Sequence, residues 1–190
     1  MPPKAKISKE LILDAAFDIA RTEGLEQINA RRISRKLGCS TQPVMYYYGA
    51  IEDIKRAVYE KADWFHSAYL MNVNPESEDP MLDIGRNYIR FAIEEPHLFR
   101  LLFQSGYAAE HNVLEMINSE ELKPILAIMV EESGMQEERM KEVFLTIALF
   151  AHGYASILAN NSLEYDEALV SGHLERAYRG AVLALREDEK

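Results

Sequence analysis

The chain has 190 residues, of which 48% are hydrophobic and 27% are charged, and its formal net charge is −10. This balance is typical of a globular protein and excludes a disordered chain. A single cysteine, Cys39, excludes an intrachain disulfide. The sequence shows no apolar run of membrane-spanning length and no signal peptide, so we expect a cytoplasmic protein that does not contact a membrane.

Charge is distributed unevenly along the chain. Residues 1–63 hold 11 lysines and arginines against 9 acidic residues, whereas residues 64–190 hold 10 against 22. No acidic residue occurs between Ile28 and Ala50, although four basic residues lie there. An acid-free basic window in an otherwise acidic chain predicts a surface that contacts nucleic-acid phosphates. We therefore expect a small DNA-facing domain joined to an acidic body.

Helix capping signals divide the first fifty residues into three helices. The first helix is predicted over residues 8–24, with Ser8 as its N-cap. A second helix follows Asn29, another N-cap residue, and ends at Gly38, which supplies a left-handed backbone. A third helix begins after Ser40. Two helices separated by about three residues predict a helix-turn-helix.

The third predicted helix presents a face that suits DNA. Val44 and Tyr48 lie one turn apart and are expected to point inward. Glutamine can pair with adenine through two hydrogen bonds, and tyrosine can donate to phosphate or pack on a thymine methyl. The alternative that the three consecutive tyrosines fill a core or a partner interface stays open, above all for Tyr48. The residues expected to point outward are Thr41, Gln42, Pro43, Tyr46 and Tyr47.

Residues 8–64 resemble the N-terminal DNA-binding domain of TetR/AcrR-family transcriptional regulators. The resemblance is carried by ILDAAFDIARTEGLEQINARRISRKLGCS (12–40), the aromatic cluster that follows, and EDI (52–54). It implies an all-helical homodimer that binds double-stranded DNA at a palindromic operator and is released by a small-molecule effector. Carried over residue by residue, it implies DNA contacts by Asn29, Arg31, Thr41, Gln42, Pro43, Tyr46 and Tyr47.

The chain departs from this family at two positions. Met45 stands where the family often has a phosphate-binding tyrosine, and Ile51 stands where a lysine often opens the fourth helix. Both departures remove contacts to the DNA backbone. Tyr46 and Lys55 are expected to compensate, since Lys55 lies one helical turn beyond Ile51. Lys55 therefore joins the predicted DNA-binding residues.

The rest of the chain is also predicted to be helical, apart from the weakly patterned residues 107–119. The fold class is therefore all-α, with a three-helix helix-turn-helix domain over 1–50 and a larger ligand-binding and dimerisation domain over 51–190. EEPHLFRLLF (94–103) and AHGYASIL (151–158) resemble a TetR subgroup, and in the family the last two helices form the dimer interface. The later predicted helices, which bring the total to about nine, are 51–72, 81–95, 97–104, 121–133, 137–160 and 165–187.

An effector pocket is expected inside the larger domain, because family pockets lie there. Aromatic and polarisable residues predict a largely apolar ligand, with His152 as a polar contact. The alternative that each of these residues only packs the core stays open. The candidates are Trp64, Tyr88, Phe91, Phe103, Tyr107, Met129, Phe144 and His152.

No pattern predicts a metal site, a cofactor or an enzyme. The five histidines share no ligand spacing, and no nucleophile elbow, phosphate loop or dinucleotide fingerprint occurs. We therefore predict a regulator, and most often in this family that means a repressor. Two alternatives remain at this point: a DNA-binding regulator without a small-molecule inducer, and a helical carrier or enzyme with a vestigial helix-turn-helix.

Overall fold

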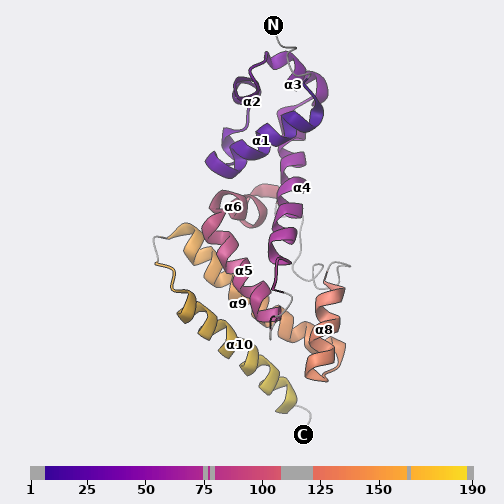
Figure 1. The fold of residues 1–190 in the computed structure, drawn as a ribbon, viewed down its shortest axis with the longest axis vertical. Coiled ribbons are helices and arrows are strands. Elements are labelled where there is room, and N and C mark those ends of the chain that lie inside the picture. The colour runs from indigo at the N-terminus through magenta and orange to yellow at the C-terminus, as the bar shows by residue number, and fades with distance from the viewer. Residues whose placement is uncertain (1–6, 75–76, 78–79, 108–121, 162–163, 188–190) are drawn as a thin grey trace. The chain divides into compact units, whose positions relative to one another are not determined.

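The computed structural model describes residues 7–74, 77, 80–107, 122–161 and 164–187 (Figure 1). These residues form nine α-helices and one short 3₁₀ helix, with no strand, so the all-α prediction is confirmed. All of the predicted stretch 107–119 except Tyr107 lies outside the described residues. The helices are α1 (Lys9–Glu23), α2 (Ala30–Leu37), α3 (Thr41–Tyr47), α4 (Ile51–Leu70), α5 (Pro80–Glu94), α6 (Pro96–Gln104), α8 (Lys123–Ser133), α9 (Glu137–Asn160) and α10 (Glu167–Glu187), and the 3₁₀ helix is η1 (Leu25–Gln27).

The chain folds into two compact units. The N-terminal unit consists of Met1–Ser67 and Glu95–Ala108, and the C-terminal unit consists of Ala68–Glu94 and Ala109–Lys190. Helix α6 therefore belongs to the same unit as α1 although it follows α5 in the chain. The division into functional domains at residue 50 remains a prediction.

The predicted caps explain where the first helices begin. The Ser8 side chain accepts a hydrogen bond from the Leu11 backbone N–H at 3.2 Å, and the Asn29 side chain accepts one from the Arg32 N–H at 3.0 Å. Each bond pairs an N–H that the first turn of a helix leaves without an intrahelical partner. Ser40 precedes α3 as predicted, but its side chain makes no capping bond.

The N-terminal unit is held by a core that α1, α2 and α3 share. Ile12 and Ile33 are fully buried, as is Val44 on α3. Helix α6 is tied to α1 by Glu95, whose buried carboxylate accepts two hydrogen bonds from the Arg21 guanidinium, one of them from Nε at 2.7 Å. The Arg21 guanidinium also lies 5.1 Å from the centre of the Phe65 ring, a cation–π contact with α4.

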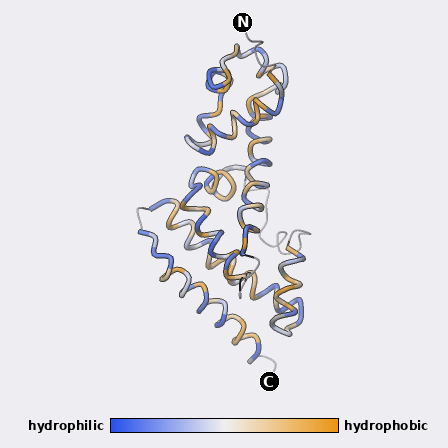
Figure 2. Tube along the Cα trace, viewed as in Figure 1, coloured by the Kyte–Doolittle hydropathy of each residue, from blue (hydrophilic) through white to orange (hydrophobic). Residues whose placement is uncertain are grey.

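The C-terminal unit is built around α5, α9 and α10. Helix α5 packs against both α9 and α10, and α8 packs against α9. Figure 2 shows hydrophobic and hydrophilic residues interspersed along these helices, as expected when one face of each is buried. The core includes Met81, Leu82, Ile89, Leu126, Met129, Met140, Val143, Phe144, Ile147 and Leu174.

Helix α9 is the one described helix that is long and apolar enough to cross a membrane by length and composition. Its most apolar 18-residue window has a mean hydropathy of 1.5. The core helix of a soluble protein passes the same test, and α9 places Met140, Val143 and Ile147 in the core of its unit. Packing accounts for this buried face, whereas only 39% of the window is buried within the described chain.

We predict that His66 makes folding sensitive to mild acid. Its imidazole is buried and meets the Phe103 ring edge-on, with ring centres 5.2 Å apart, and burial lowers the pKa of His66 to about 4. The unfolded chain takes up this proton near pH 6.5, whereas the folded chain resists it. The free energy of unfolding should therefore fall by about 3 kcal/mol between roughly pH 6.5 and pH 4.

The measurement is urea unfolding of the wild type and of His66→Leu at several pH values. Carboxylates that titrate near pH 4 act equally in both proteins, so the difference isolates the histidine. The loss of stability should be smaller in His66→Leu over this range. An identical pH dependence in the two proteins would contradict the prediction.

Candidate nucleic-acid interface

The turn between α2 and α3 has the backbone that the sequence predicts. Gly38 adopts φ +64° and ψ 32°, the left-handed conformation that side chains other than glycine rarely take. Its N–H donates to Arg35 O at 3.2 Å, and the N–H of Cys39 donates to Ser34 O at 3.0 Å. Only residues 38–40 separate the two helices. Helices α2 and α3 therefore form a helix-turn-helix.

The inward face of α3 is fixed by Val44 and Tyr48, both of which are buried. The Tyr48 hydroxyl donates to the Lys9 carbonyl at 3.5 Å, and the Lys9 ammonium lies 5.1 Å from the centre of the Tyr48 ring. Tyr48 therefore fills the core, and the sequence predicted this inward position for Tyr48 but not for Tyr46 and Tyr47. Its bond to Lys9 also anchors the start of α1. Sequence reasoning missed the contribution of Lys9.

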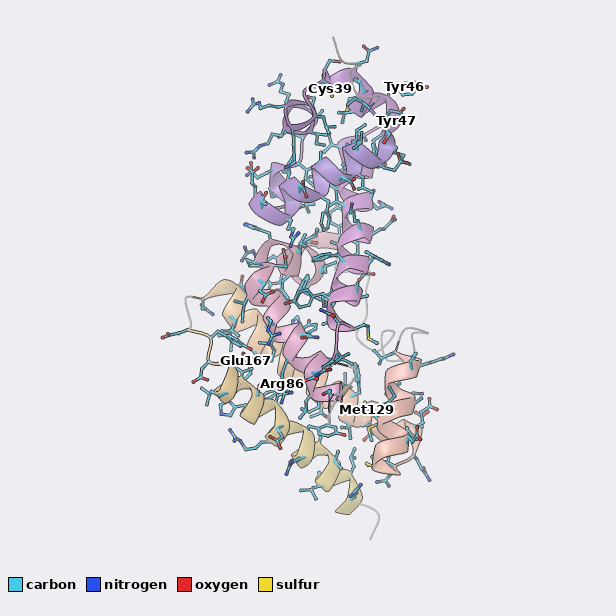
Figure 3. The ribbon with its side chains drawn as sticks, viewed as in Figure 1. Cys39, Tyr46, Tyr47, Arg86, Met129 and Glu167 are labelled. Atoms are coloured by element: carbon cyan, nitrogen blue, oxygen red, sulfur yellow. The ribbon has the colours of Figure 1, made fainter. Side chains whose placement is uncertain are left out.

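The outward face of α3 carries the predicted DNA-binding residues. The Tyr46 side chain, labelled with Tyr47 in Figure 3, is 82% exposed. Thr41 and Gln42 are also exposed. Pro43 is half-buried in the first turn, where its missing N–H removes no intrahelical bond. The rings of Tyr46 and Tyr47 meet edge-on at 5.4 Å. This face offers an amide, a threonine hydroxyl and aromatic rings to an external partner.

Tyr47 differs from Tyr46 because its hydroxyl already has a partner within the protein. It donates to the Ile7 carbonyl at 3.3 Å. The bond joins the end of α3 to the residue that precedes the Ser8 cap. Tyr47 can therefore position the chain before α1 as well as face DNA, a role that the sequence did not indicate.

The basic residues of α2 are not equally available to a partner. Arg32 is bound by Gln27 and Glu23, and Lys36 pairs with Asp18 at 3.4 Å. Arg31 and Arg35 are exposed, as is the Asn29 cap. Arg31 is therefore available to a partner at the start of α2, and its contact with DNA remains a prediction.

Lys55 is more constrained than the sequence suggests. Its side chain is only 17% exposed and pairs with Glu52 at 3.1 Å. The Glu52 carboxylate also accepts a hydrogen bond from the Tyr107 hydroxyl at 2.5 Å, which, with Lys55, lowers the pKa of Glu52. Burial and the Glu52 charge raise the pKa of Tyr107 to about 12. Lys55 would have to leave Glu52 to reach DNA, so its role there remains a prediction.

The eight predicted effector residues do not form one cluster within either unit. Trp64, Phe103 and Tyr107 belong to the N-terminal unit, and the other five belong to the C-terminal unit. Trp64 is 72% exposed. Their roles in ligand binding remain predictions. Phe91, Met129 and Phe144 are buried in the structure, and Phe103 is half-buried.

Tyr88 and His152 are the two effector candidates that the structure joins directly. The Tyr88 hydroxyl and His152 Nδ1 lie 2.8 Å apart, and His152 Nε2 lies 3.2 Å from the Ser156 hydroxyl. Burial raises the pKa of Tyr88 and lowers the pKa of His152, so the neutral imidazole is favoured. This polar pair lies beside the core of the C-terminal unit.

Among the described residues, no group of three or more His, Cys, Asp or Glu side chains is placed to hold a metal. Cys39 is a free thiol of intermediate exposure in the turn before α3.

A helix-turn-helix with an exposed polar and aromatic third helix, joined to a helical C-terminal unit, defines a class of DNA-binding regulators. Residues 81–181 match the sequence pattern of the tetracyclin repressor-like C-terminal domain. Because this match covers more than half of the chain, the chain belongs to the TetR family of transcriptional regulators. It is a DNA-binding transcriptional regulator and not an enzyme.

Similar proteins extend over nearly the whole chain. An uncharacterised HTH-type transcriptional regulator of Bacillus subtilis, YobS, is 21% identical over 90% of this chain and 88% of its own length. A TetR-family regulator structure from Streptomyces coelicolor superposes with a TM-score of 0.70 at 15% identity, covering 95% of this chain and 82% of that one. A transcriptional regulator structure from Pseudomonas aeruginosa gives a TM-score of 0.68 at 10% identity, covering 100% and 99%. At these identities the two structures show the shared fold alone.

We predict that removing the Tyr46 side chain weakens sequence-specific DNA binding without destabilising the protein. The ring is exposed, so Tyr46→Ala opens no core cavity. Loss of one specific DNA contact costs about 1–3 kcal/mol, so the Kd should rise roughly 5- to 150-fold. The measurement is fluorescence anisotropy on the preferred duplex at fixed salt.

Trp64→Ala provides the matched control, because it removes another exposed aromatic side chain from the same unit. Its DNA affinity should stay within about twofold of the wild type, because Trp64 is not among the predicted DNA-contacting residues. Equal losses in Tyr46→Ala and Trp64→Ala would count against α3 as the reading helix.

Proposed function

We propose that this regulator is a repressor that binds a palindromic operator as a homodimer and leaves it when a small ligand occupies the C-terminal domain. The observation that carries the proposal is the exposure of Thr41, Gln42 and Tyr46 on a helix whose opposite face is buried by Val44 and Tyr48. A short helix anchored in this way can enter a major groove with its side chains held in place. We further propose that the protein works in the cytoplasm.

Operator reading would divide between base and phosphate contacts. Gln42 is the candidate for adenine, because its amide can donate and accept at once. Arg31 and Asn29 at the start of α2 are candidates for phosphates, with Thr41 and Tyr47 flanking Gln42 and Tyr46 on α3. Met45 is exposed and brings no hydroxyl, so the phosphate contact it lacks would fall to Tyr46.

Dimerisation is supported by exposed apolar residues on the last two helices. On α9, Leu149, Gly153 and Ile157 form an apolar stripe, and on α10 Leu169 and Leu183 are exposed. A Cβ added to Gly153 would meet no atom within 4 Å in the single chain. A second copy of the chain would cover these residues and bring two α3 helices about one duplex turn apart, roughly 34 Å.

Ligand release would act through α4, which is shared between the two units because they divide after Ser67. The ligand shifts the DNA-binding equilibrium only by its different affinity for the two conformations. A coupling of about 2–3 kcal/mol would weaken operator binding roughly 30- to 150-fold. A largely apolar ligand fits the proposal best where the Tyr88–His152 pair offers a polar contact beside the apolar core.

We predict that selection from a random duplex library enriches an inverted repeat. Each half of a two-fold symmetric dimer would read the same bases in opposite directions. Purified full-length chain is used for selection, and the winning duplex is titrated by anisotropy at several salt concentrations. Enrichment of no sequence, with only weak salt-sensitive binding, would contradict the operator proposal.

We also predict that Gly153→Glu converts a dimer into a folded monomer. The new carboxylate has space in the single chain but would meet its two-fold mate or the apolar stripe in a dimer. Sedimentation equilibrium at micromolar concentration measures the mass, and circular dichroism checks the fold. Ala127→Glu on the exposed surface of α8 is the matched control and should stay dimeric. A monomeric wild type, or a dimeric Gly153→Glu, would contradict the predicted interface.

A further inference from the structure

One face of α5 is polar where a core helix is usually apolar. Asp83, Arg86, Asn87 and Arg90 recur at intervals of three, one and three residues, which places them on one side of the helix. Together with Glu167 and Ser171 of α10 and the segment 72–74, they line an open cavity of about 420 Å³. This volume lies within the range of small-molecule sites in proteins. All of these residues belong to the C-terminal unit.

The charged side chains of this cavity are held by one another. Arg86 Nη1 donates to Asp83 at 2.7 Å, and its Nε donates to the Ser171 hydroxyl at 3.1 Å. Arg90 of α5 donates to Glu167 of α10 at 2.6 Å. Figure 3 labels Arg86 and Glu167, which lie on these two neighbouring helices. A guanidinium has five N–H donors and each carboxylate has two oxygens. These bonds therefore fix the side chains. They leave further N–H donors on the two arginines and further acceptor positions on the two carboxylates.

Close packing of the two helices keeps the cavity walls in place. A Cβ added to Gly85, which neighbours Arg86 on α5, would lie 2.7 Å from Leu174 Cδ2 on α10. A larger residue at position 85 would force the Leu174 side chain to move. The buried Asn87 fixes the third wall, because its amide donates to the carbonyls of Leu70 and Asn72, each at 3.2 Å.

We propose that this cavity binds a small zwitterion that carries both a carboxylate and an amine, of the amino-acid or dipeptide class. The ligand carboxylate accepts hydrogen bonds from the guanidinium groups of Arg86 and Arg90. A planar guanidinium suits this role, because it can donate two parallel N–H bonds to one carboxylate. The ligand ammonium donates to the carboxylates of Asp83 and Glu167. The site is separate from the Tyr88–His152 pair and takes a different class of compound.

The balance of charge in the cavity selects this class over others. Two arginines face two carboxylates, so a simple anion would be repelled by Asp83 and Glu167, and a simple cation by the arginines. An apolar compound would remove water from these ion pairs and offer their remaining donors and acceptors no hydrogen bonds, which is costly. A zwitterion adds to the existing ion pairs without breaking them, because each sign of charge meets its opposite.

The position of the cavity links the ligand to the end of α4. Leu70 is the last residue of α4, and its carbonyl is held by the Asn87 amide. A ligand that bonds beside Asn87 and the segment 72–74 therefore touches the connection from α4 to α5. Binding itself does not depend on the proposed function, whereas the use of the ligand as an effector rests on it.

The test measures binding to the full-length chain without DNA. The probes are the twenty common L-amino acids and their glycyl dipeptides, screened at millimolar concentration by thermal unfolding and then titrated by isothermal calorimetry. At least one probe should raise the unfolding midpoint of the wild type. Its analogue with a blocked amine and its analogue with an amidated carboxylate should each bind at least tenfold more weakly. Binding of no probe, or equal binding of a blocked analogue, would overturn the proposal.

Variants locate the site on the two helices. Arg90→Gln should raise the Kd at least tenfold, and Arg90→Lys, which keeps the charge but loses the fork, should have an intermediate effect. Lys141→Gln is the matched control, because it removes an ion-paired cation of α9 outside the cavity, and it should bind as the wild type does. Equal affinity in Arg90→Gln and Lys141→Gln would overturn the assignment. Because no DNA is present, these outcomes are independent of operator reading.

Discussion

The bond between Arg21 and Glu95 determines which helices make up the DNA-binding unit. Glu95 is the residue between α5 and α6, and its carboxylate is buried against the guanidinium of α1. Removing Arg21, which is itself 43% exposed, would leave the buried Glu95 carboxylate without its charged partner, so the pair helps to hold α6 against α1. His97 of α6 also packs closely against Gly24, the residue that follows α1. A Cβ built on Gly24 would lie only 3.3 Å from His97 Nδ1. Helix α6 is therefore part of the support of α2 and α3.

This arrangement makes the chain pass between the two units three times, after Ser67, before Glu95 and after Ala108. Two of these crossings fall within or directly beside a helix, α4 in the first case and the α5–α6 junction in the second. Packed helices shift between discrete positions more readily than they deform, so a change at the end of α4 or α5 has a direct covalent path to the helix-turn-helix. The bond from Asn87 to the last carbonyl of α4 lies on this path.

Local chemistry was predictable from the sequence, because a cap or a left-handed glycine acts over a few residues. The Asn29 cap and the left-handed Gly38 follow this rule. So do the inward position of Val44 and the outward position of Tyr46 on α3. Contacts between distant segments were not predictable. The bond of Tyr47 to Ile7 and the bond of Tyr107 to Glu52, which is the partner of Lys55, join residues far apart in the chain. The exposure of Trp64 has the same origin, since aromatic character alone does not tell which side of α4 is covered.

The polar face of α5 and the predicted effector residues lie in different surroundings. Phe91 and Met129 are buried in the core, where packing density leaves little room for another molecule, and their roles in ligand binding remain predictions. An open cavity can remain where charged side chains are too costly to bury fully. Such side chains form ion pairs with one another at the junction between two helices. Arg86 and Arg90 do this on α5, at the same spacing that would place leucines in a core helix.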